Sequence, residues 1–174
     1  MKIRTAVLTV SDRSSAGKRP DRSGPALEKA VSDQGWACLS LVVVPDDQRQ
    51  IREQLIAWSD GTWDDGQSID LILTTGGTGF APRDVTPEAT RAVIDRPAPG
   101  LAEAMRSASL EITPHAMLSR AEAGIRGHTL IVNLPGSPKA VLENFQVIAP
   151  VLPHAVELLR EEQQAEDSHR ALDH

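Results

Sequence analysis

Short, mostly apolar runs recur along the chain, and they constrain its fold more than any other feature of the sequence. Each run is rich in β-branched residues and stops at a polar or glycine-rich segment. Runs of this kind are typical of strands that are buried on both faces of a sheet. The predicted strands are Ile3–Val10, Leu39–Val44, Ile69–Thr74 and Thr129–Asn133.

Segments with a helical spacing of apolar residues separate these runs. In the first of them, for example, Leu27, Ala30 and Val31 fall on one side of a helix, and Gly35 supplies a stop. The predicted helices cover 24–34, 46–60, Pro87–Asp95 and Leu101–Leu110, with a last helix that begins near Pro138. Alternation of buried strands with amphipathic helices predicts a doubly wound α/β fold: a mostly parallel sheet with helices on both faces.

Length and composition favour a single globular domain that acts on small molecules. At 174 residues the chain can bury one core, and we expect a domain over residues 1–160, then a charged, flexible tail over 161–174. The net charge of −6 argues against nucleic-acid binding. The sequence shows neither a signal peptide nor a membrane-spanning segment, which predicts a cytoplasmic protein with no membrane partner.

The third predicted strand runs into Gly76-Gly77-Thr78-Gly79, and Asp84 follows. Glycines allow successive backbone N–H groups to turn toward one concavity, where they can bind a phosphate, and Thr75 and Thr78 add hydroxyl groups. Taken alone, the same four residues would more often form an ordinary turn between a strand and a helix.

Polar segments also follow the other three predicted strands. They are Ser11–Arg13, Pro45–Asp47 and Leu134–Lys139. In a doubly wound fold, ligands bind outside the carboxyl ends of the strands, where such loops converge. The four loops are therefore predicted to form one site.

With these segments the chain resembles the MoaB/Mog family, and most closely its molybdopterin adenylyltransferases. The resemblance covers roughly residues 3–160. It is carried by SDR (11–13), PDD (45–47), TTGGTG and RDVTPEAT within 74–90, GLAEAMR (100–106), SRAEAGIRG (119–127) and NLPGSPKA (133–140).

The resemblance implies an activity in molybdenum cofactor biosynthesis. Family members transfer AMP from ATP to the terminal phosphate of molybdopterin, releasing pyrophosphate, with Mg²⁺ and as homotrimers; the product then passes to a molybdate-inserting protein. The family also includes assembly modules such as the related domain of gephyrin, so a non-catalytic, molybdopterin-binding scaffold is the alternative. A phosphate-binding enzyme of another family is disfavoured, because the chain lacks GxxxxGK[ST] and a GxGxxG after its first strand.

Asp46 and Asp84 match the two aspartates that this family uses for catalysis. Transfer between two polyanions needs charge neutralisation and in-line positioning, and carboxylate oxygens suit Mg²⁺, so we expect both residues to be catalytic and to hold the metal. The simpler alternative is structural: Asp46 could cap the helix that follows it, and Asp84 the turn before Pro87.

The remaining candidates are expected to bind substrate: most would use backbone or hydroxyl donors or positive charge, and the prolines would stiffen their loop. They are Asp12, Arg13, Thr75, Gly76, Gly77, Thr78, Gly79, Asn133, Pro135, Gly136, Ser137, Pro138 and Lys139. Two of the charged ones have structural alternatives: Arg13 could pair with Asp12, and Lys139 could be merely solvated. The basic loop at 16–23 is expected to be either a mobile cover that attracts anions or a solvated surface loop.

Overall fold

A computed structural model describes residues 2–61, 66 and 68–161. Most of the predicted polar loop at 62–68, and the predicted tail beyond Glu161, lie outside the described residues. The strands are β1 (Arg4–Val10), β2 (Ala37–Val44), β3 (Leu71–Thr75), β4 (Arg96–Pro97), β5 (Ala123–Arg126) and β6 (Thr129–Leu134). The helices are α1 (Asp12–Ser15), α2 (Ser23–Asp33), α3 (Gln48–Asp60), α4 (Thr86–Arg91), α5 (Pro99–Leu110), the 3-10 helix η1 (Pro114–Leu118) and α6 (Pro138–Ile148). Residues 152–161 are also helical.

The strands form one sheet in the order β2-β1-β3-β6-β5-β4. The first four are mutually parallel, β5 runs antiparallel to β6, and β4, at the edge, runs antiparallel to β5. This confirms the predicted mostly parallel α/β fold and the four predicted strands. The two edge strands were not predicted, because they are short and carry Pro97 and Gly124, residues that weaken a strand signal.

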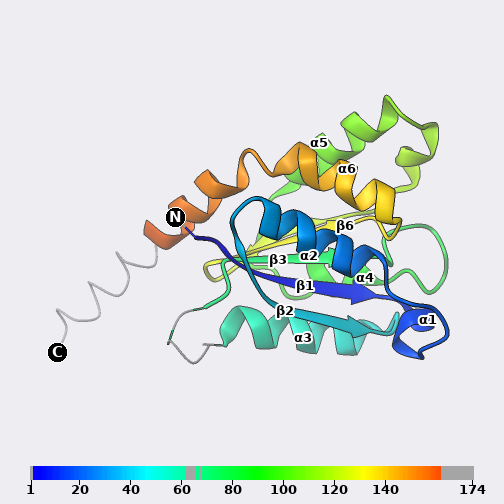
Figure 1. Cartoon of the computed structure of the whole chain (residues 1–174), viewed down its shortest axis with the longest axis horizontal. Coiled ribbons are helices and arrows are strands. Elements are labelled where there is room, and N and C mark those ends of the chain that lie inside the picture. The colour runs from blue at the N-terminus through cyan, green and yellow to red at the C-terminus, as the bar shows by residue number, and fades with distance from the viewer. Residues whose placement is uncertain (1, 62–65, 67, 162–174) are drawn as a thin grey trace.

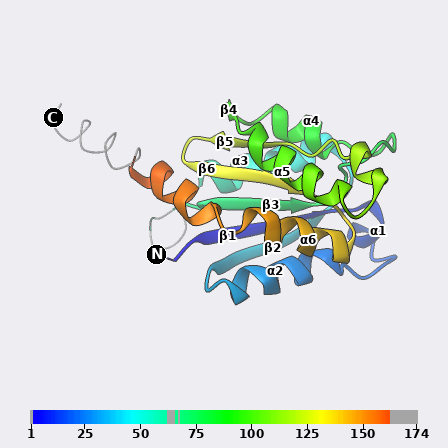
Figure 2. The ribbon, with the colours of Figure 1, turned by 90° about the horizontal axis from the view of Figure 1, so that it is seen from above.

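Helices cover both faces of the sheet (Figures 1 and 2). On one face, α2, α5 and α6 bury apolar side chains against Leu71 and Leu73. On the other, α3 and α4 pack against Ile72, the residue between those two. The alternation along β3 therefore divides the core into two layers, as period-two geometry requires. Within the described ranges, no helix has both the length and the apolar character to cross a membrane.

Local signals set the helix boundaries next to the carboxyl ends of the strands. The side chain of Asp47 accepts a hydrogen bond from Gln50 N at 2.9 Å, so α3 begins at Gln48, two residues after the predicted start. Ser137 occupies the same position before α6, with Pro138 in the first turn, which confirms the predicted start of that helix. The predicted helix 87–95 is shorter and ends at Arg91.

Candidate functional site

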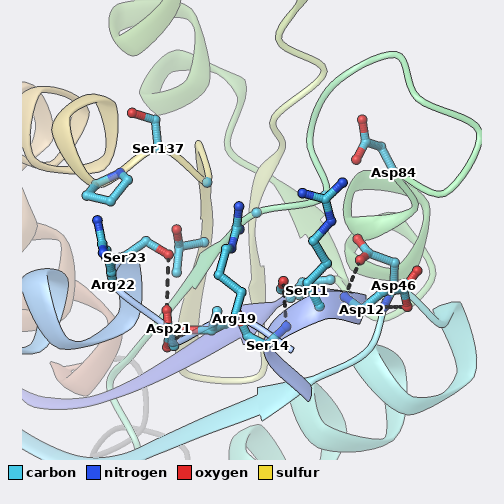
Figure 3. A pocket seen from close by; sticks show the side chains of 18 of the residues that line it. Ser11, Asp12, Ser14, Arg19, Asp21, Arg22, Ser23, Asp46, Asp84 and Ser137 are labelled. Carbon is cyan, nitrogen blue, oxygen red and sulfur yellow. Dashed lines mark hydrogen bonds between the residues drawn. The ribbon is translucent and has the colours of Figure 1, made fainter. Parts of the chain in front are cut away.

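The carboxyl ends of β1, β2 and β3 open onto a pocket of about 900 Å³. The loops after these strands line it together with the segment that enters α6, so all four of the polar loops singled out in the sequence contribute (Figure 3). The lining includes the predicted residues Asp12, Arg13, Asp46, Thr75, Gly76, Gly77, Asp84, Gly136, Ser137 and Pro138. Their roles toward a ligand remain predictions.

The glycine turn at the end of β3 is required by geometry. Gly76 and Gly77 have φ angles of 98° and 65°, in the left-handed region that favours glycine. A Cβ at Gly76 would collide with the carbonyl oxygen of Val10, and one at Gly77 would lie 3.1 Å from Asp46 Oδ1. The turn therefore brings bare backbone directly against the aspartate.

The amide groups of this turn differ in what they donate to. Gly76 N donates to Leu134 O at 3.1 Å, so this amide extends the sheet and is not available to a ligand. The amides of Gly77, Thr78 and Gly79 donate to no group in the part of the chain that the structure describes. The hydroxyl group of Thr75 donates to Pro135 O at 2.8 Å, which fixes the neighbouring loop rather than leaving a donor for a phosphate.

Asp46 is held by an exchange of hydrogen bonds with Asp12. Asp12 N donates to Asp46 Oδ2 at 2.8 Å, and Asp46 N donates to Asp12 Oδ1 at 3.0 Å. The pair ties the loop after β1 to the loop after β2. Asp46 does not cap α3, since Asp47 does so. The capping alternative for Asp46 is therefore wrong.

Burial raises the pKa of Asp46 above its ordinary value, and the negative charges of Asp12 and Asp84 raise it further. Three carboxylates thus share one wall of the pocket, opposite Arg22 and Ser137 in Figure 3. A nearby cation would stabilise the ionised form of Asp46, and such an environment is expected of a metal ligand.

Asp84 belongs to the exposed loop between β3 and α4. Its Oδ2 accepts a hydrogen bond from Ala81 N at 2.9 Å, so the side chain does close the local turn. It does not cap α4, whose N-cap residue is Val85. Structural and ligand-binding roles are compatible here, because the turn uses only one of the two carboxylate oxygens.

The donor set fits Mg²⁺ that is also held by substrate phosphates. Among the described residues, Oδ1 of Asp46 and Oδ1 of Asp84 accept no hydrogen bond. No cluster of three or more His, Cys, Asp or Glu side chains is arranged for a metal within those residues. Two hard oxygen ligands from the protein, completed by phosphates and water, are typical of Mg²⁺ in phosphoryl-transfer sites.

Arg83 is a site residue that the sequence did not single out. Its guanidinium donates two hydrogen bonds to Asp12, from Nε to Oδ2 and from Nη2 to Oδ1, each at 2.9 Å. This bidentate contact holds the pKa of Asp12 below its ordinary value. The structural alternative for Arg13, a pairing with Asp12, is therefore wrong: Arg13 lines the pocket, and Arg83 makes the ion pair. No sequence signal distinguishes these arginines, since the contact spans 71 positions.

Four predicted binding residues do not line the large pocket. Thr78, Gly79, Asn133 and Pro135 line a smaller cavity of about 280 Å³ beside α5 and η1. Asn133 is fully buried and donates to Thr74 Oγ1 at 3.0 Å and Thr90 Oγ1 at 2.9 Å. Its amide therefore joins β6 to β3 and α4 and is not positioned to hold a ligand in the large pocket.

Lys139 also lies outside the pocket lining. Its ammonium group is 3.7 Å from Glu143 Oε1, one turn further along α6. The side chain of Lys139 is 80% exposed, so the structure favours the solvated alternative for this lysine.

The basic loop at 16–23 is anchored to β1. Thr9 Oγ1 donates to Asp21 Oδ2 at 2.7 Å, and Gly24 N donates to Asp21 Oδ1 at 3.1 Å. Arg19 and Arg22, on either side of Asp21, line the pocket. The loop thus contributes positive charge to the wall of the pocket opposite Asp46 and Asp84, and the hydrogen bonds of Asp21 hold the loop in place.

The fold and the pocket define an α/β protein in which a glycine turn at the end of the sheet lies beside acidic side chains. A family model described as "Probable molybdopterin binding domain" matches residues 6–154. The chain belongs to this family, which confirms the resemblance found in the sequence.

The relatives that this chain covers over most of their length include adenylyltransferases. The chain is 42% identical over 159 residues to the molybdopterin adenylyltransferase of Helicobacter pylori strain J99, covering 90% of this chain and 88% of the relative. It is also 44% identical over 180 residues to gephyrin of Dictyostelium discoideum, covering 97% of this chain. The chain spans only 24% of that gephyrin and 26% of the cinnamon protein of Drosophila melanogaster.

Solved structures agree with these relationships. The molybdopterin biosynthesis enzyme MoaB of Thermus thermophilus superposes with a TM-score of 0.82 at 48% identity, over 90% of this chain and 96% of that one. A MogA structure superposes with the same TM-score of 0.82 at 39% identity, over 90% of this chain and 99% of that one. The predicted three-layer fold of the family is thereby confirmed.

Proposed function

We propose that this protein is a molybdopterin adenylyltransferase that transfers AMP from Mg²⁺-bound ATP to the terminal phosphate of molybdopterin. The observation that carries the proposal is the glycine turn at the end of β3, which sets Asp46 against the bare backbone of Gly77 and Asp84 against that of Gly79, with both carboxylates lining the pocket. Relatives that bear this activity in their names match most of the chain and are matched over most of their own length.

In the proposed reaction, an oxygen of the molybdopterin phosphate attacks the α-phosphorus of ATP. The bond from that phosphorus to the oxygen bridging the β-phosphate breaks, and pyrophosphate leaves with the electron pair. Phosphate groups need no activation by covalent catalysis, so the protein acts by positioning and by neutralising charge. A pocket of about 900 Å³ lies at the upper end of the range for small-molecule sites, as two substrates require.

Each side of the pocket has its own part in this proposal. Asp46 and Asp84 would hold Mg²⁺, which supplies positive charge to the reacting phosphates. The free amides of the turn, with Gly77 lining the pocket, would donate to phosphate oxygens. Arg19 and Arg22 would attract the polyanions and bind the phosphates away from the metal.

Pyrophosphate release tests the proposal directly. Purified protein with ATP, Mg²⁺ and molybdopterin is expected to release one pyrophosphate for each adenylylated molybdopterin, and omission of molybdopterin or chelation of Mg²⁺ should abolish the release. The similarity to gephyrin favours the scaffold as the second candidate. Tight molybdopterin binding without pyrophosphate release would select that alternative.

We further propose that the protein is a homotrimer and that it passes its product to a molybdate-inserting protein. Large apolar side chains are exposed on α5, on η1 and on the connection between them, at Leu110, Ile112, Met117 and Leu118, and a contact between copies would bury them. Light scattering on the purified protein measures the subunit number. A monomer at micromolar concentration would contradict the trimer without affecting the assignment of the reaction.

A further inference from the structure

The loop that carries Asp84 is tied to the rest of the site at two points: Arg83 pairs with Asp12, and the amide and hydroxyl groups of Thr86 donate to Gly77 O and Gly76 O. Between the end of β3 at Thr75 and the start of α4 at Thr86, the chain forms neither a helix nor a strand. Residues 80–83 are exposed, and the side chain of Phe80 is 66% exposed. The carboxylate of Asp84 accepts one hydrogen bond, from within its own turn. Contacts with the backbone on either side of the exposed residues therefore contribute to the position of Asp84 in the pocket.

Arg120 makes the contacts that fix this backbone. Its Nε donates to Gly79 O at 2.7 Å, and its Nη2 donates to Asp84 O at 2.6 Å, so one guanidinium joins the two ends of the exposed loop. Its own backbone amide donates to Thr78 O at 2.8 Å. Arginine suits this task because its planar group carries several donors in a rigid arrangement.

A half-buried carboxylate anchors the guanidinium in turn. Nη1 of Arg120 donates to Oε1 of Glu88, which lies in the first turn of α4. Burial acts to raise the pKa of Glu88, but hydrogen bonds and the charges of Arg120 and Arg91 outweigh it and lower the pKa. Because Glu88 is ionised at neutral pH and fixed to a helix, the arginine is held between α4 and the loop.

We propose that Arg120 is a positioning residue for the adenylyl transfer: by closing the base of the loop from Gly79 to Asp84, it sets the carboxylate of Asp84 in the pocket. The inference rests on the proposed function for its kinetic part. Arg120 does not line the large pocket, so it acts through the carbonyl group of Asp84 and not by contact with a substrate. Lysine, with one ammonium group, cannot reproduce donation from three nitrogens in fixed directions.

The test compares Arg120→Lys with Arg126→Lys. Arg126 is a matched control because its guanidinium also donates to a carboxylate and to a backbone carbonyl. Its Nε and Nη2 donate to Asp60 at 2.9 and 2.6 Å, and its Nη1 donates to Val93 O at 2.9 Å. It lies at the end of β5 that pairs with the start of β6, away from the pocket. We expect similar, small losses of Tm in the two variants.

Kinetics and hydrogen exchange should separate the two variants. A displacement of a reacting group by about 1 Å costs on the order of 10²-fold in rate, so Arg120→Lys should lower kcat by about 50-fold with KM for ATP changed less than about threefold. Amide exchange over residues 79–86 should speed up by about tenfold on loss of two anchoring bonds. Arg126→Lys should leave kcat and this exchange unchanged.

Chemical rescue adds a readout that a merely structural role would not produce. In Arg120→Ala, free guanidinium ions at non-denaturing concentration should restore part of kcat and slow the exchange of residues 79–86, whereas ammonium ions should not. Wild-type kcat in Arg120→Lys, or a loss of kcat with unchanged exchange in the loop, would overturn the proposal. If the wild-type protein releases no pyrophosphate, the proposed function fails, and the exchange measurements still decide whether Arg120 orders the loop.

Discussion

The two ends of the central sheet use carboxylates in opposite ways. At the end away from the pocket, two acidic side chains are each paired with an arginine: Asp70 accepts from Arg160 at 2.6 and 2.8 Å, and Asp60 accepts from Arg126 at 2.6 and 2.9 Å. These carboxylates raise the pKa of both arginines. At the pocket end, only Asp12 among the carboxylates of Asp12, Asp46 and Asp84 is paired with an arginine, Arg83, and the pKa of Asp46 is raised.

This difference separates acids that stabilise the fold from acids that are available for chemistry. A paired carboxylate has its charge compensated within the protein, so it gains little from a ligand. A carboxylate that is partly buried beside others of like charge destabilises the free protein and is relieved by a cation. The contrast predicts that substitutions at the two ends will affect different measurements.

The largest effect is expected for Asp84→Asn. The amide keeps an oxygen that can accept from Ala81 N, so the loop should retain its turn. Loss of the negative charge removes one ligand of the proposed metal, and we expect kcat to fall by about 10³-fold. Pyrophosphate release measures the rate, and circular dichroism with calorimetric binding of molybdopterin checks that fold and binding persist. An undiminished rate would remove Asp84 from the mechanism.

Asp46→Asn should lower the rate less and raise the stability. The rate is expected to fall by about 10²-fold, since Asp84 remains to hold the metal. The raised pKa of Asp46 means that its ionised form is disfavoured in the fold. Stability therefore falls as pH rises through the window between the unfolded and the folded pKa, and the neutral amide avoids this loss at pH 7. Thermal unfolding at pH 7 without Mg²⁺ should give a higher Tm than the wild type, and a lower one would contradict the electrostatic argument.

Asp70→Asn should produce the reverse pattern. The side chain is only 9% exposed and also accepts from Arg4 N at 2.7 Å, and weakening a partly buried pair of this kind costs about 2 kcal/mol. In a chain of this size that corresponds to a fall in Tm of about 4–8 °C. The kcat per folded molecule should be unchanged, since Asp70 lies at the amino end of β3. A loss of kcat with unchanged Tm would break the proposed division between the two ends.

Much of this arrangement could be predicted from the sequence because it depends on local patterns. The apolar runs indicated the four parallel strands, and the polar segments that follow them could be assigned to one edge by topology alone. Asp46 and Asp84 were identified by their position in motifs, and both line the same pocket in the structure. Their catalytic role remains a prediction.

Contacts between distant residues could not be predicted, and these decide what individual side chains do. Neither the pairing of Arg83 with Asp12 nor the contact of Arg120 with the 79–84 loop leaves a periodic signal. Asn133 shows the same limit from the other side: its motif suggested contact with a ligand, and the sequence did not reveal that its side-chain amide donates to Thr74 and Thr90. Adjacent aspartates were also hard to tell apart, since only the backbone geometry makes Asp47 the helix cap and leaves Asp46 in the pocket.

The smallest effect is expected for Arg83→Gln, and it tests the charge balance of the pocket end. The positive charge of Arg83 acts to lower the pKa of both Asp12 and Asp46. Removing that charge should raise both pKa values, so protons compete with Mg²⁺ at higher pH. The acid limb of the pH profile of kcat/KM should then move upward by a few tenths of a pH unit, the size expected for an exposed charge.

The direction of this shift is what discriminates between explanations. If Arg83 acted mainly by attracting ATP, its removal would raise KM for ATP about equally at every pH and leave the acid limb in place. Asp12 adds a second readout: its lowered pKa gives stability above the unfolded pKa that is lost as pH falls through the folded pKa. Without Arg83, the variant should lose less stability than the wild type when Asp12 is protonated. The Tm difference between wild type and variant should therefore be smaller at pH 3 than at pH 7. A pH-independent Tm difference would show that the pairing of Arg83 with Asp12 does not set the charge of the pocket wall.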